Sequence, residues 1–158
     1  MTPGEVSAGL RRAAFETEQA LEPATTPNGL ARSFGLIHEF RQGDVVVTMA
    51  AFRTGDLSLY FSSGGGILGG IQHEKVAEMV RKTVPLLAPL APQLERSDDF
   101  KEPAPGEVCF YILTTKGRYC SRLSSMPAHD PANPNFQLFA LCQGLIGELR
   151  KASTGRGA

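Results

Sequence analysis

The sequence has no net charge, few cysteines and no long hydrophobic run, and each of these absences excludes a class of protein. The 16 Lys and Arg residues balance the 16 Asp and Glu residues, so no net field attracts the chain to nucleic acid or to anionic lipid. No apolar run approaches the roughly 20 residues that a helix needs to cross a bilayer. The N-terminal segment lacks the pattern of a signal peptide. We therefore expect neither a nucleic-acid partner nor a membrane partner.

Cysteine is also sparse, and its spacing carries no redox or metal motif. Cys109, Cys120 and Cys142 are an odd number without a CxxC pair, which favours reduced thiols and a cytoplasmic protein. If the chain turns at residues 116–117, Cys120 lies opposite Leu113, too far along the ladder from Cys109 to form a disulfide. We therefore expect these two cysteines to be small core residues.

Histidine is equally rare, and the motifs of catalysis are missing. His38, His73 and His129 are the three histidines, and none has a Cys, Asp or Glu neighbour at zinc-ligand spacing. We expect no metal site and no cofactor. Ser62 and Ser63 have no base that the sequence reveals, so no catalytic residue is assigned. His38 lies among apolar strand residues, where a hydrogen-bonded, half-buried histidine is the usual explanation.

The residues that are present predict one α+β domain spanning 1–158. Its hydrophobic fraction of 42% and its charged fraction of 20% are ordinary for a chain of 158 residues with its own core. Hydrophobic periodicity and turn residues predict the elements in the order α-β-β-β-α-β-β-α, with a single antiparallel sheet of about five strands. The predicted helices cover 6–21, 72–84 and 134–149, the strands cover 33–40, 44–52, 57–62, 108–114 and 118–123, the loops cover about 22–32, 88–106 and 124–133, and the tail 151–158 is expected to fray.

Two details of this prediction concern register and packing. A hairpin turn at Gln42 and Gly43 places Leu36, His38 and Phe40 beside Val45, Val47 and Met49. In the last helix, which Asn133 caps and Pro134 begins, apolar residues cover more than half of the circumference. That helix is either deeply buried or shared with a partner.

The order of helix, three strands, helix, two strands and helix is similar to that of type III secretion chaperones. A shifted version of the order would resemble roadblock or longin domains. The similarity covers most of the chain, and it lies in the order of elements and in no residue motif. The resemblance implies a small dimeric binding module.

The least ordinary segment is a glycine-rich loop between the third strand and the second helix. Gly64, Gly66 and Gly69 satisfy G-x-G-x-x-G, and backbone N–H groups there can hold a phosphate. A second interpretation is structural, with glycines needed for close approach and with Ile67 and Leu68 turned inward. A third interpretation has Ile67 and Leu68 exposed for a partner. The candidate ligand-binding or partner-binding residues are Ser62, Ser63, Gly64, Gly65, Gly66, Ile67, Leu68, Gly69, Gly70 and His73.

These patterns lead to a functional hypothesis. We expect a non-enzymatic binding or adaptor module that acts through protein–protein contacts, with a homodimer as one form, through the apolar last helix or the glycine-rich loop. The alternative is a small-molecule or anion-binding protein, or an enzyme, with its site at residues 64–70.

Overall fold

The computed structural model describes residues 1–154 as three α-helices, short 3-10 helices and seven strands. The α-helices are α1 (Pro3–Glu16), α2 (Glu74–Thr83) and α3 (Pro134–Thr154), and the 3-10 helices are η1 (Gly70–Gln72), η2 (Val84–Leu87) and η3 (Ala91–Gln93). The strands are β1 (Ser33–Gln42), β2 (Val45–Phe52), β3 (Leu57–Phe61), β4 (Gly66–Ile67), β5 (Glu95–Arg96), β6 (Val108–Thr114) and β7 (Gly117–Leu123). No helix among these residues is long and apolar enough to span a membrane.

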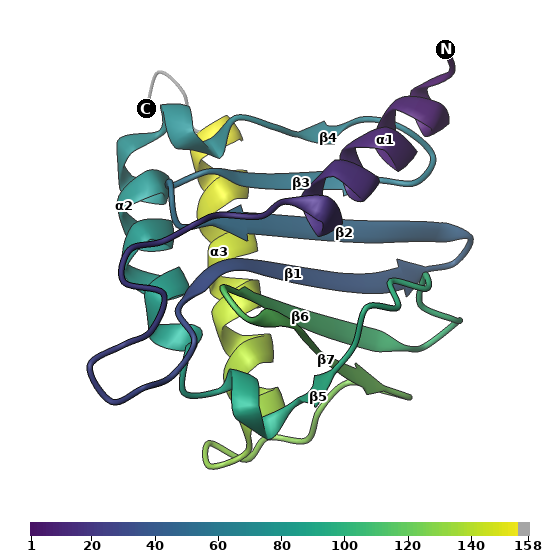
Figure 1. Cartoon of the computed structure of the whole chain (residues 1–158). Helices are drawn as coiled ribbons and strands as arrows, with labels where there is room; N and C mark the ends of the chain where they lie inside the picture. The colour runs from purple at the N-terminus through teal and green to yellow at the C-terminus, as the bar shows by residue number, and fades with distance from the viewer. Residues whose placement is uncertain (155–158) are drawn as a thin grey trace.

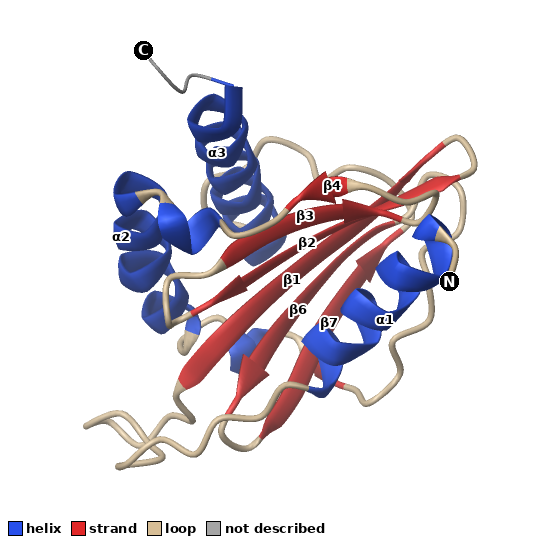
Figure 2. Ribbon diagram, turned by 90° about the horizontal axis from the view of Figure 1, so that it is seen from above, coloured by secondary structure: helices blue, strands red, loops and turns tan. Residues whose placement is uncertain are grey.

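The strands form one antiparallel sheet in the order β4-β3-β2-β1-β6-β7-β5. Helix α1 lies across one face of this sheet, and α2 and α3 lie on the other face (Figures 1 and 2). The α+β class and the helix–strand order are therefore confirmed, with five longer strands as predicted. The two additional strands, β4 and β5, contain two residues each. Such short strands have no periodicity that a sequence pattern can reveal.

Each face of the sheet carries its own hydrophobic core. The core under α2 and α3 includes Leu36, Met49, Phe110 and Leu145. The core under α1 is built around Phe15, which is fully buried. Because both faces are covered, the central strand β1 is buried along seven consecutive residues.

The predicted hairpin registers are wrong by two residues. The first turn consists of Gly43 and Asp44, so Phe40 pairs with Val47 and His38 with Met49. Gly43 has the positive φ, 59°, that suits the first central position of a type II′ turn. A shift of two residues leaves every side chain on its predicted face.

The second hairpin turns one residue earlier than predicted, whereas the first turns one residue later. Its central residues are Thr115 and Lys116, and Cys120 therefore pairs with Tyr111. Cys109 pairs with Arg122, so the two cysteines are diagonal neighbours, closer than we predicted. Both thiols are nevertheless free.

The first helix begins and ends earlier than predicted. The Thr2 side chain accepts a hydrogen bond from the Glu5 N–H, and the Glu5 side chain accepts one from the Thr2 N–H, which is a capping box. The helix ends at Glu16, and the chain then runs to β1 without a regular element except for an isolated bridge between Thr25 and Ala31. Val6, the first residue of the predicted helix, is 46% exposed. The prediction missed the T-x-x-E signal of the capping box.

The last helix begins as predicted and is buried by its own chain. The Asn133 side chain accepts from the Asn135 N–H at 2.8 Å, and Pro134 is the first helical residue. Every large apolar side chain of α3 is buried or half-buried. The helix continues to Thr154 and so includes residues 151–154 of the predicted tail, and the rest of that tail, 155–158, lies outside the described residues.

Candidate functional site

The glycine-rich loop lies at one edge of the sheet, where it forms β4 and then leads into η1 and α2 (Figure 1). Ser62 closes the end of the β2–β3 ladder, because its N–H donates to the Val46 carbonyl at 2.9 Å and its Oγ accepts from the Val46 N–H at 2.8 Å. Ser63 and Gly65 are exposed. Gly64 lies against Pro3 at the start of α1. The loop therefore contacts both the sheet and α1.

Two glycines in this loop are required by close approach of the backbone to β3. A Cβ atom on Gly66 would lie 2.1 Å from the Leu59 carbonyl oxygen, and Gly66 also has a φ of 149°. A Cβ atom on the buried Gly70 would lie 2.6 Å from the Leu57 carbonyl oxygen. Contacts this short exclude any side chain, so these glycines fix the path of the loop.

The two aliphatic residues of the loop face different surroundings. Ile67 is half-buried and packs against the core under α2 and α3. Leu68 is 54% exposed, and Ile71, three residues further on, is 42% exposed. Our structural interpretation placed Ile67 and Leu68 together inside, and the partner interpretation placed them together outside. The structure separates them, and it adds Ile71 to the exposed set.

The surroundings of the loop differ from those of a dinucleotide-binding turn. The sheet is antiparallel throughout, and the strand before the loop pairs in antiparallel fashion with β2 and β4. Gly69 leads into the three-residue η1, after which His73 is extended (φ −102°, ψ 108°) and α2 begins at Glu74. The glycines thus do not open directly onto a helix N-terminus, and the first turn of α2 carries an acidic side chain.

The two edges of the sheet differ in charge. Strand β5, at one edge, consists of Glu95 and Arg96, and charged residues discourage pairing with another chain. At the opposite edge, residues 62–72 contain no charged side chain. Strand β4 pairs with β3 on one side and has no further described strand on the other. The glycine-rich loop is therefore the less protected edge.

A second polar cluster, which the sequence analysis missed, lies between α1 and the sheet. The Arg11 guanidinium donates to both carboxylate oxygens of Glu39, at 2.6 and 2.9 Å, and the Thr48 hydroxyl donates to the same carboxylate at 2.7 Å. Arg11 also donates to the Phe100 carbonyl. Glu39 is fully buried. The charged residue within the apolar run of β1 was the available signal, because a buried carboxylate needs a partner.

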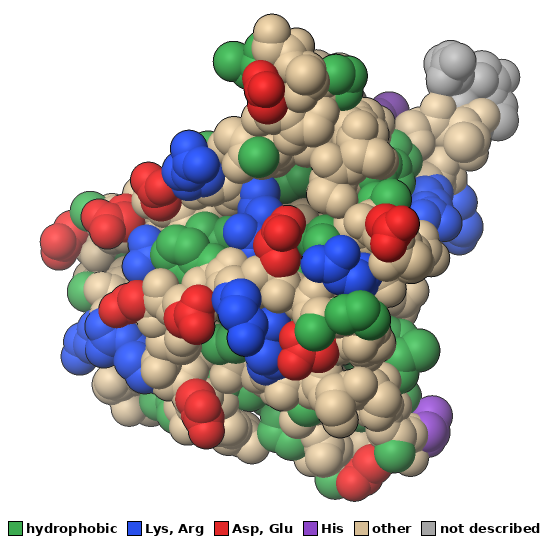
Figure 3. All heavy atoms as spheres, turned by 90° about the vertical axis from the view of Figure 1, so that its right-hand side faces the viewer, with side chains coloured by type: hydrophobic (Ala, Val, Ile, Leu, Met, Phe, Trp, Pro, Cys, Tyr) green, Lys and Arg blue, Asp and Glu red, His purple; other side chains and the backbone are tan. Residues whose placement is uncertain are grey.

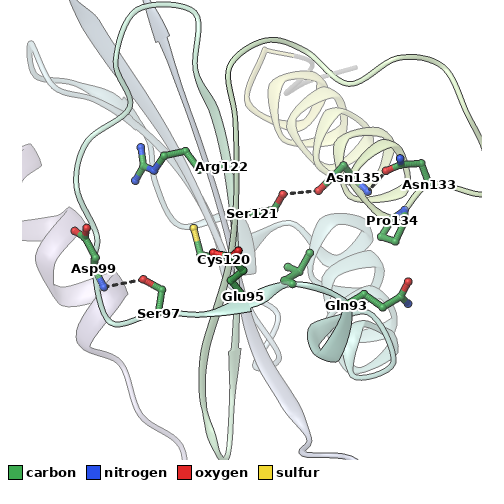
Figure 4. Close-up of a pocket in the computed structure, with 11 residues that line it drawn as sticks. Gln93, Glu95, Ser97, Asp99, Cys120, Ser121, Arg122, Asn133, Pro134 and Asn135 are labelled. Carbon is green, nitrogen blue, oxygen red and sulfur yellow. Dashed lines mark hydrogen bonds between the residues drawn. The ribbon is translucent and has the colours of Figure 1, made fainter.

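A polar groove of about 490 Å³ follows the edge of β7 beside the N-terminus of α3 (Figure 4). Two of its polar side chains, Ser121 and Arg122, are paired within the chain. Ser121 donates to the Asn135 side chain at 2.5 Å. Arg122 forms an ion pair with Glu107 at 3.2 Å and donates to the Tyr111 hydroxyl at 2.9 Å.

The thiols offer no activated nucleophile. Burial raises the pKa of Cys120 in the groove, raises that of Cys109 to about 12 and raises that of Cys142 as well. Within residues 1–154, no group of three or more His, Cys, Asp or Glu side chains is placed to hold a metal ion. Neither His73 nor His129 therefore belongs to such a group.

On the one face that the space-filling view draws, charge does not single out a patch. On the face shown in Figure 3, positive and negative side chains are interspersed without a large area of one sign.

Comparisons with protein-family models, with curated proteins and with solved structures each gave no match. The function is therefore argued from the residues themselves.

Proposed function

We propose that this protein is a small binding module that recognises an extended segment of a partner protein at the glycine-rich loop and the β4 edge. The observation that carries the proposal is the contrast between the two edges of the sheet. One edge strand is charged, whereas residues 62–72 are uncharged and expose Leu68 and Ile71. Addition of a strand to an open edge is a common mode of peptide recognition.

The loop is suited to binding because its conformation is already fixed. Gly66 and Gly70 hold it against β3, and Ile67 anchors it in the core. An ordered loop loses less conformational entropy when a partner binds than a flexible one does. Main-chain hydrogen bonds to β4 supply affinity in this mode, and burial of Leu68 and Ile71 supplies selectivity for apolar side chains.

The last helix, the other surface that we considered for a partner, is not part of this proposal. Its apolar excess packs against the sheet and α2, including Leu145 and Leu149. A homodimer through the β4 edge stays part of the proposal, because a second copy can supply the extended segment.

The test is selection of peptides from a random 12-residue library, followed by fluorescence polarisation with the selected peptides. We expect Leu68→Asp to weaken binding by about tenfold or more, because it places a charge in an apolar contact. Leu86→Asp is the matched control, since Leu86 is 73% exposed and lies on η2, away from this loop.

When a peptide binds, the amide chemical shifts that change in a ¹⁵N spectrum should be those of residues 64–72. Light scattering will show whether the partner is a second copy. Peptides that bind wild type and Leu68→Asp equally would refute the proposal. A thermal-shift panel of nucleotides and phosphates tests the alternative, in which the loop holds an anion.

A further inference from the structure

A cavity of about 430 Å³ lies between the sheet and α3, and none of the residues that line it belongs to the glycine-rich loop. Its helical wall is one stripe of α3, because the α3 residues that line it are spaced by four, three and four positions. Its size falls within the range of small-molecule sites. Its lining residues on α3 are Phe139, Gln143, Ile146 and Arg150.

The inner part of this cavity is apolar and contains one buried polar side chain. Leu59, Val108 and Ile146 are buried lining residues. His38 lines the same cavity and is fully buried, with its ring stacked on Phe110 at 4.7 Å between centroids. The polar character of the inner part therefore comes from a single imidazole.

The unused atom of that imidazole is a hydrogen-bond acceptor. Nδ1 of His38 lies 3.1 Å from the Cys109 carbonyl oxygen. A carbonyl accepts and never donates, so Nδ1 carries the proton and Nε2 presents its lone pair. Nε2 is buried and has no partner among the described residues. Buried polar atoms are nearly always paired, so an unpaired one calls for an explanation.

The outer part of the cavity has a different chemistry. Arg150 is exposed, and no carboxylate of the described chain lies within ion-pair distance of it. Arg41 donates from Nε to the Pro103 carbonyl at 2.8 Å, which leaves its positive charge uncompensated. The one acidic lining residue, Glu107, is already paired with Arg122. An anionic group is therefore favoured at this end.

We propose that this cavity binds a small aromatic acid whose inner hydroxyl or N–H group donates to Nε2 of His38 and whose carboxylate lies beside Arg41 and Arg150. The apolar wall accommodates the ring of the ligand. Nε2 is covered in the structure, so the ligand displaces a neighbouring side chain. Phe40 and Phe139 are suited to this movement, because both line the cavity, are half-buried and lie beside the His38 ring, with ring centroids 5.2 and 6.2 Å away.

The experiment compares three ligands by titration of ¹⁵N-labelled protein. These are 3-(4-hydroxyphenyl)propionate, 3-phenylpropionate, which lacks the hydroxyl, and 4-propylphenol, which lacks the carboxylate. We expect the hydroxyphenyl acid to bind about tenfold more tightly than either analogue, since each analogue lacks one hydrogen-bonding group. The amide chemical shifts that change when the ligand binds should be those of residues 38–42 and 139–150.

Variants assign the two ends of the ligand. Arg150→Gln should weaken binding of the hydroxyphenyl acid and leave the affinity for 4-propylphenol unchanged. Lys151→Gln makes the same change of charge one residue away and should alter the affinity for neither ligand. His38→Phe should abolish the advantage of the hydroxyl, and the ligand comparison in wild type holds even if this variant is unstable. Equal binding of all ligands, or no binding, overturns the proposal. Leu68→Asp should bind these ligands normally, which separates this site from the partner site.

Discussion

The buried His38 should make the stability of this protein depend on pH. Burial lowers the pKa of His38 from 6.5 to about 4, so the folded protein holds the neutral imidazole. The unfolded chain takes up a proton below pH 6.5 and the folded protein does not, so stability is present above that pH and is lost as the pH falls. From these two pKa values, the loss is roughly 2 kcal/mol at pH 5 and about 3 kcal/mol at pH 4.

The assay is urea denaturation of wild type and His38→Phe between pH 7.5 and pH 4. Phenylalanine keeps an aromatic ring against Phe110 but cannot take up a proton, so the variant should lack this part of the pH dependence. Every other titratable group is the same in both proteins, so its contribution cancels in the difference. The free energy of unfolding of wild type should fall relative to that of the variant by about 2 kcal/mol from pH 7.5 to pH 5. Parallel curves for the two proteins would show that His38 is not held neutral in the fold.

Three further predictions concern backbone, charge and thiols. In thermal or urea melts, Gly66→Ala should lower the free energy of unfolding by about 2 kcal/mol or more, because its Cβ would meet the Leu59 carbonyl. Gly147→Ala, which adds a Cβ in open space on α3, should raise the free energy of unfolding by about 0.5–1 kcal/mol. Arg11→Met should cost about 3 kcal/mol, because it leaves the buried Glu39 carboxylate without a cation. Adding Glu39→Gln should restore part of this loss, and additive losses would mean that the pair is not coupled. In iodoacetamide labelling read by mass spectrometry, the native protein should react at the half-buried Cys120, slowly, and at the other two cysteines after unfolding; rapid native labelling of those two would contradict their burial.

Much of the fold follows from local patterns in the sequence. Alternation and turn residues identified the five longer strands, and the Asn133-Pro134 pair identified the start of α3. Hairpin register was less certain, because moving a turn by one residue shifts pairing by two and leaves the faces unchanged. Thus the hydrophobic pattern is equally satisfied by the predicted and the observed registers, and the choice depended on the turn geometry at Gly43.

The candidate sites were predictable to a smaller extent. The glycine-rich loop was visible as a run of residues, but the separation of Ile67 from Leu68 depends on contacts with β3 and the core. Two-residue strands such as β4 leave no periodic signal. The Arg11–Glu39 pair joins residues 28 positions apart, and no local rule connects them.

The sequence by itself determined the class of fold, the helical and strand segments and the face of the sheet on which each strand residue lies, because these depend on neighbours a few residues away. The tertiary structure alone decided which helix covers which face. It also decided that His38 is left with an unpaired Nε2 and that the uncharged loop forms an edge of the sheet. These features depend on long-range packing, in which each buried polar group finds, or fails to find, a partner from a distant part of the chain.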